Sequence, residues 1–128
     1  MNTLINPSTI APPVAAYSHA VLSSTGSRIL HVSGTVGTRA DGSIGATVGD
    51  QAEAVWAALR EILEAADMTL ADVVSYTTYA VAGQPLGEVM AARDRALAGH
   101  KPASTLITVA ALARPEWLVE ISAVAASG

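Results

Sequence analysis

The sequence predicts an α+β domain in which two helices cover one face of a mixed β-sheet. Segments rich in β-branched and aromatic residues alternate with two amphipathic segments of helical period, in the order β-β-α-β-α-β-β. A strand–helix–strand–helix alternation framed by pairs of strands places both helices on one side of the sheet. The 128 residues suffice for one domain and not for two, so we expect a single domain over residues 1–128.

The first third of the chain is expected to form an extended lead-in followed by two strands. Three early prolines predict an irregular or extended conformation over residues 1–16. Residues 20–23 and 28–36 are apolar and β-favouring, and a Ser-Thr-Gly-Ser turn separates them. Asp41-Gly42 is typical of a tight hairpin turn.

Two segments have the period of an amphipathic helix. Residues 50–66 form the first, in which Asp50 is placed to cap the first amides. Residues 86–97 form the second, and Gly99 follows as a C-terminal cap. The apolar residues of the first helix that share one face are Val55, Leu59, Ile62, Leu63 and Ala66.

The remaining strands are expected at residues 73–81, 104–112 and 117–125. The last two are apolar and meet at Arg114-Pro115, so we expect them to pair with each other. With both helices on one side, the other face of the sheet would be bare and too apolar to remain in water.

The composition favours a soluble cytoplasmic protein that associates with copies of itself. Hydrophobic residues make up 51% of the chain and charged residues only 14%, so some apolar surface is expected to meet another subunit. The net charge of −4, without a cluster of basic residues, argues against binding to nucleic acids or to anionic membranes. The absence of cysteine excludes disulfides and thiolate chemistry.

Glu120 is the strongest single candidate for a functional residue, because it interrupts an apolar strand. A buried carboxylate is costly unless it is paired or hydrated. Strand alternation places it on the face opposite Val119 and Ile121. Two interpretations remain open: Glu120 accepts structural hydrogen bonds, or it lines a cleft and holds a water molecule.

Four further residues are candidates for ligand binding in the first half of the chain. Tyr17 follows the proline-rich lead-in and can cover a cleft, or it is a simple packing aromatic. His19 lies beside it as a possible hydrogen-bond donor. Ser33-Gly34 interrupts a strand, which predicts a bulge that exposes a backbone N–H or that only changes the twist.

Ser104 and Thr105 open the penultimate strand and are candidates for binding a polar group. Their hydroxyls can equally satisfy backbone groups at the end of the strand. His19, His31 and His100 lack the spacing of metal ligands, and the chain contains no nucleotide-binding glycine motif. We therefore expect neither a metal nor a cofactor. The sequence also lacks a G-x-S-x-G nucleophile elbow, which argues against a serine hydrolase.

Several segments together resemble the RidA/YjgF family, whose members include enamine/imine deaminases and proteins formerly called L-PSP endoribonucleases or translation inhibitors. The likeness covers nearly the whole chain. Its pieces are AYSHA at 16–20, VSGT at 32–35, the helix that begins QAEAVWAAL, TTYAV at 77–81, PASTL at 102–106 and VEI at 119–121.

The resemblance implies a chorismate-mutase-like fold, a homotrimer and three clefts at the subunit junctions. It also implies that Tyr17, the Ser33-Gly34 backbone, the segment after Pro102 and Glu120 meet in each cleft. Deaminating members carry an arginine directly after Pro-Ala, and Ser104 occupies that position here.

The predicted function is a cofactor-free hydrolase of a small enamine or imine intermediate. Glu120 would deprotonate a water molecule that attacks the C=N carbon and would then protonate the leaving amine. Because Ser104 replaces the arginine, the substrate is expected to differ from small 2-imino acids, being larger, less anionic or anchored elsewhere. The alternative is a trimer of the same family that binds a small metabolite without converting it.

Overall fold

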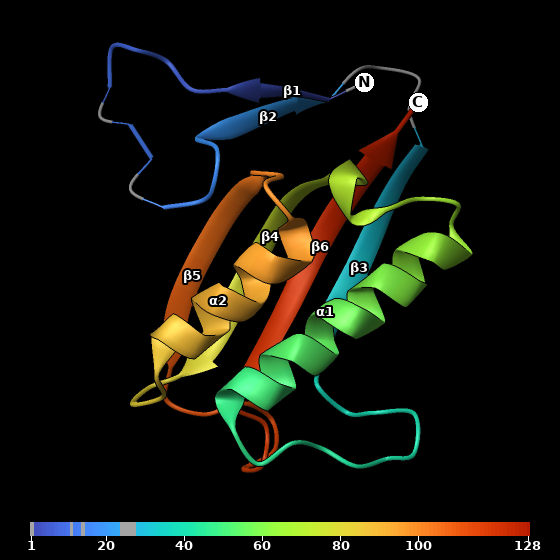
Figure 1. The fold of residues 1–128 in the computed structure, drawn as a ribbon, viewed down its shortest axis with the longest axis vertical. Helices are drawn as coiled ribbons and strands as arrows, with labels where there is room; N and C mark the ends of the chain where they lie inside the picture. The colour runs from blue at the N-terminus through green and yellow to red at the C-terminus, as the bar shows by residue number, and fades with distance from the viewer. Residues whose placement is uncertain (1, 11, 14, 24–27) are drawn as a thin grey trace.

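The computed structural model of the chain describes residues 2–10, 12–13, 15–23 and 28–128. Two helices cover one face of a four-stranded sheet, which confirms the predicted α+β class (Figure 1). A short 3₁₀ turn, η1 (Leu70–Asp72), precedes the second sheet strand in chain order. The sheet strands are β3 (Arg28–Val36), β4 (Val73–Val81), β5 (Ala103–Val109) and β6 (Val119–Ser127), and the helices are α1 (Val48–Ala65) and α2 (Leu86–Leu97).

The strands of the sheet are arranged in the order β3-β6-β4-β5. β4 and β5 are parallel because α2 crosses between them, whereas β6 is antiparallel to both β3 and β4. The prediction that the two closing strands pair with each other is therefore wrong. Residues 110–118 carry the chain past β4, so β4 lies between β5 and β6.

Two short strands lie outside this sheet. β1 (Asn2–Ile5) and β2 (Ala20–Ser23) form an antiparallel pair of their own (Figure 1). The segment 1–16, predicted to be irregular or extended, thus contains a strand near its start. The prolines that follow this strand had favoured the irregular prediction. The predicted turn at 24–27 lies outside the described residues. The tight turn at Asp41-Gly42 is present, with Gly42 at φ 87°.

α1 begins two residues earlier than predicted, because Thr47 and not Asp50 is its N-cap. The Thr47 hydroxyl accepts a hydrogen bond of 3.1 Å from the Asp50 amide. Ile62 lies at the edge of the buried face and is 37% exposed, contrary to expectation. The side chains of α1 that enter the core are Val48, Ala52, Val55, Trp56, Leu59 and Leu63.

Alternation along β6 separates a covered face of the sheet from an open one. Val119, Ile121 and Ala123 are buried in the core under the helices. Glu120 and Ser122 are half-buried on the opposite face, called the open face below. In the part of the chain that the structure describes, no helix is long and apolar enough to cross a membrane.

Candidate functional site

The carboxylate of Glu120 lies on the open face, above the backbone of β3. A Cβ atom at Gly34 would overlap a Glu120 carboxylate oxygen and lie 2.8 Å from Glu120 Cδ. In the part of the chain that the structure describes, the Glu120 carboxylate makes no hydrogen bond or ion pair. Within the described residues of this subunit, the Glu120 carboxylate therefore accepts no structural hydrogen bond.

Ser33 and Gly34 form the bulge that the sequence indicated. The pairing of β3 with β6 shifts register between Val32 and Thr35, and both intervening residues are exposed. The Thr35 hydroxyl donates a 3.0 Å hydrogen bond to the Ser33 carbonyl. The bulge lets β6 bring Glu120 against the glycine, where any side chain would obstruct it.

Tyr79 is a neighbour of Glu120 that the sequence did not reveal. The two residues are Cα partners on adjacent antiparallel strands, so their side chains lie side by side on the open face. Tyr79 is half-buried, as Glu120 is. Alternation along β4 was visible in the sequence, but only the register between β4 and β6 places this phenol beside the carboxylate.

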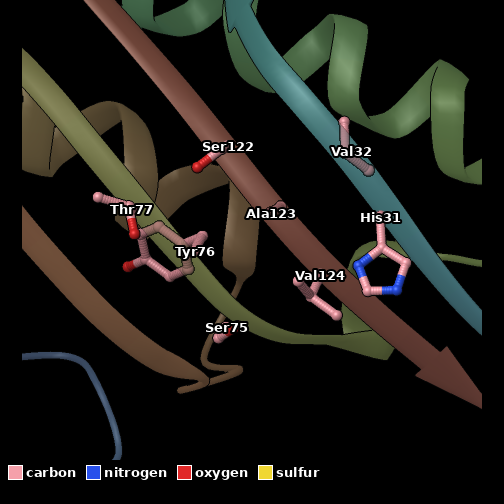
Figure 2. Close-up of a pocket in the computed structure, with 8 residues that line it drawn as sticks. All are labelled: His31, Val32, Ser75, Tyr76, Thr77, Ser122, Ala123 and Val124. Carbon is pink, nitrogen blue, oxygen red and sulfur yellow. The ribbon is translucent and has the colours of Figure 1, made fainter.

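A groove of about 220 Å³ extends across the open face from β4 to β3. Figure 2 shows His31, Ser75, Thr77 and Ser122 among the residues that line it. Thr105 is the Cα partner of Thr77, so its hydroxyl belongs to the same row across the strands. Ser122 lies two residues from Glu120 on the same face, which places the carboxylate near this row of hydroxyls.

The other predicted residues lie at the edge of the sheet, along the start of β5. The Ser18 amide donates a 3.0 Å hydrogen bond to the Pro102 carbonyl, and Ser18 forms an isolated parallel bridge with Ala103. The rings of Tyr17 and His19, on either side of Ser18, meet edge to face with centroids 6.1 Å apart. This segment therefore runs beside the Pro-Ala-Ser segment within the subunit.

Ser104 faces the helices, whereas Glu120 faces away from them. Ser104 is the Cα partner of Tyr76, whose ring is buried in the core against Trp56. Its neighbour Thr105 points to the open face, because successive residues of a strand alternate. Within one subunit the structure thus groups Thr105 with the row near Glu120, and it leaves Tyr17, His19 and Ser104 at the edge.

A buried arginine lies close to Ser104. Arg93 of α2 is 8% exposed. Its guanidinium and the Ser104 hydroxyl are the polar neighbours of the Tyr76 phenol that favour its ionised form. Burial raises the pKa of Tyr76, and these two polar neighbours partly oppose that rise. Nothing in the helical pattern of the sequence showed that Arg93 turns inward.

Metal ligands were not expected, and in the described ranges no three side chains of His, Asp or Glu gather in a way that could hold an ion. His100 Nε2 lies 2.8 Å from the Val73 carbonyl, and His31 lines the groove.

Comparison with known proteins assigns the chain to a family. Residues 8–127 match the family model described as Endoribonuclease L-PSP. The chain belongs to this family, also called Rid/YjgF. Among solved structures, a Rid family protein of unknown function, YyfB from Yersinia pestis, is 40% identical over 97% of each chain, with a TM-score of 0.88.

Two further solved structures resemble this Rid/YjgF protein over 98% of both chains. A putative endoribonuclease L-PSP from Entamoeba histolytica is 30% identical, with a TM-score of 0.72. A Mycobacterium tuberculosis member of the YjgF/YER057c/UK114 family is 26% identical, with a TM-score of 0.68. No curated protein matches the chain. Membership of the family supports a role in binding or processing small molecules.

Proposed function

We propose that this protein is a cofactor-free hydrolase of a small enamine or imine, acting as a homotrimer with Glu120 as its catalytic residue. The single observation that carries the proposal is the state of the Glu120 carboxylate. It is half-buried, lies over a glycine that leaves room for it, and has no hydrogen-bond or ion-pair partner in the described chain. A carboxylate so placed is suited to accept a proton from water.

The trimer is proposed because the site of one subunit is incomplete. Tyr17, His19 and Ser104 lie at the sheet edge and Glu120 on the open face, so they would meet only if the edge of one subunit reached the open face of the next. The open face also carries apolar side chains that water would otherwise surround. Ile29 is 61% exposed and Ile107 is 42% exposed.

In the proposed reaction, Glu120 takes a proton from water while the water oxygen bonds to the iminium carbon. The electrons of the C=N π bond move to nitrogen, which gives a neutral carbinolamine. The protonated Glu120 then returns its proton to the nitrogen, the C–N bond breaks and the oxygen forms the new carbonyl. The hydroxyl proton leaves with the amine, so the products are a carbonyl compound and ammonium. The iminium carbon is electrophilic by itself, so these steps need only the protein's own groups.

The test is ammonia release from imines that an amino-acid oxidase generates in situ. Glu120→Gln keeps the size of the side chain and removes the base, so we expect at least a 100-fold loss of kcat/KM. The matched control is Glu116→Gln, an exposed glutamate in the preceding loop, which should retain wild-type turnover. Equal rates for wild type and Glu120→Gln would remove Glu120 from the mechanism.

The second candidate is a trimer that binds a metabolite without converting it. The position of Ser104 favours this alternative, because the residue that replaces the family's arginine faces the helices and not Glu120. In that case, small 2-oxo acids would raise the melting temperature while no imine of the panel released ammonia faster than the uncatalysed control.

A further inference from the structure

Tyr79 places a phenol beside the Glu120 carboxylate on the open face. The two residues are Cα partners on β4 and β6, and the Cβ atoms of such a pair lie about 4.5–5.5 Å apart. Tyr79 is half-buried, and in the described ranges its hydroxyl neither donates nor accepts a hydrogen bond. An acid and a phenol side by side can act on one small molecule placed over both of them.

The other side chains in this row across the sheet are apolar. Val36 of β3 is the Cα partner of Glu120 on the side away from Tyr79. Ile107 of β5 is the Cα partner of Tyr79 on the side away from Glu120. The hydroxyl of Ser122 belongs to the next row, two residues along the strand and thus roughly 7 Å away. Within this row, the side-chain proton donor beside Glu120 is therefore the phenol.

The hydrolysis of an enamine contains a step for which Glu120 has the wrong protonation state. An enamine is electron-rich at the carbon β to its nitrogen, and this carbon must gain a proton before the carbon next to nitrogen becomes electrophilic. Glu120 must be ionised to take a proton from water, so it does not carry the proton that the enamine needs. A phenol carries an O–H group that can donate.

We propose that Tyr79 is a catalytic residue that protonates the β-carbon of an enamine bound over Glu120. The electrons of the C=C π bond form the new C–H bond, and the nitrogen lone pair forms the C=N π bond. The electrons of the O–H bond stay on the phenolate oxygen, which then takes a proton from bulk water. The iminium so formed is the species that the water activated by Glu120 attacks.

This inference rests on the proposed function and separates its two types of substrate. An imine needs no proton on carbon, so its hydrolysis requires Glu120 and not Tyr79. An enamine requires both residues. The protein would thus take enamines directly, before the solvent converts them into imines.

The first experiment compares the two types of substrate with the full-length chain. A pyridoxal-phosphate dehydratase acting on threonine supplies an enamine in situ, and an amino-acid oxidase acting on leucine supplies an imine. Tyr79→Phe should lower kcat/KM for the enamine by about tenfold or more and leave that for the imine unchanged. The matched control is Tyr76→Phe, because Tyr76 lies on the same strand, is 3% exposed and packs against Trp56 under the helices. This variant should keep both activities.

A second measurement follows the new C–H bond itself. In D2O, a residue that delivers deuterium from one side gives one configuration at carbon 3 of the 2-oxobutanoate product, whereas the solvent gives both. The configuration is determined by NMR after a stereospecific dehydrogenase has reduced the product. With a dehydratase that alone gives equal amounts, we expect one configuration from the wild type and equal amounts from Tyr79→Phe.

The outcomes separate this inference from the proposed function. The role of the phenol would be overturned by an equal loss on both substrates in Tyr79→Phe, by no loss on the enamine, by the same loss in Tyr76→Phe, or by a mixed configuration from the wild type. If Glu120→Gln kept its ammonia release from the imine, the proposed function would fail. A single configuration that disappears in Tyr79→Phe would even then support Tyr79 as the donor.

Discussion

The contact between Gly34 and Glu120 allows a sharp test of whether the position of the carboxylate matters. In Gly34→Ala, the new Cβ would lie 2.8 Å from Glu120 Cδ, where ordinary contact begins near 3.4 Å. The atom nearest to the new Cβ is a Glu120 carboxylate oxygen, which the Cβ would overlap, so the carboxylate must retreat by roughly 1 Å or change rotamer. A misplacement approaching 1 Å at a reacting group costs about 100-fold in rate, so we expect kcat/KM to fall about 10- to 100-fold.

The same change should alter stability only slightly, because the side chain that must move is flexible and half-buried. An off-rotamer side chain costs about 0.5–1.5 kcal/mol, which corresponds to a melting temperature lower by roughly 2–8 °C. The assay pairs ammonia release with thermal unfolding. The control is Gly87→Ala, since nothing lies within 4 Å of a Cβ at Gly87. Full activity in Gly34→Ala would refute the idea that Glu120 must occupy its present position.

Three further predictions follow from the same structure. Ile107→Glu on the open face should dissociate the oligomer in light scattering, whereas Ile62→Glu on α1 should leave the mass unchanged; a trimer that survives Ile107→Glu would contradict an interface on that face. Gln51→Ala should lower the free energy of unfolding in urea by about 2–5 kcal/mol, because the buried amide bridges Gly45, Glu116 and Leu118; a loss below 1 kcal/mol would mean that water replaces the bridge. Burial raises the pKa of Tyr76, so the unfolded chain ionises first and stability should fall as pH rises above about 10; Tyr76→Phe should flatten that decline, and parallel curves would exclude the effect.

Hydrophobic period was sufficient to predict most elements. The predicted strand at residues 73–81 and the helix at 86–97 agree with β4 and α2, because both segments have a clear period along the chain. The start of α1 was missed by two residues, since a threonine and an aspartate three residues apart offer competing caps. β1 was missed because β2, the strand with which it pairs, lies on the far side of the proline-rich segment.

The candidate site likewise has one feature that the sequence predicted and others that it could not predict. That Glu120 faces away from Val119 and Ile121 follows from alternation, which is a property of the strand itself. That Tyr79 stands beside it, and that Gly34 lies beneath it, depends on the registers of β6 with β4 and β3. Register is a relation between distant segments, so no local pattern contains it.

The sequence by itself therefore determined the class of fold, the helical and extended segments and the face on which Glu120 lies, because each depends on residues within a few positions of one another. Only the tertiary structure decided that β4 separates β5 from β6, that Ser104 and Glu120 occupy opposite faces, and that Arg93 turns inward to Tyr76. Those features arise from packing two helices on a particular strand order, and the free energy of that packing is shared among residues far apart in the chain.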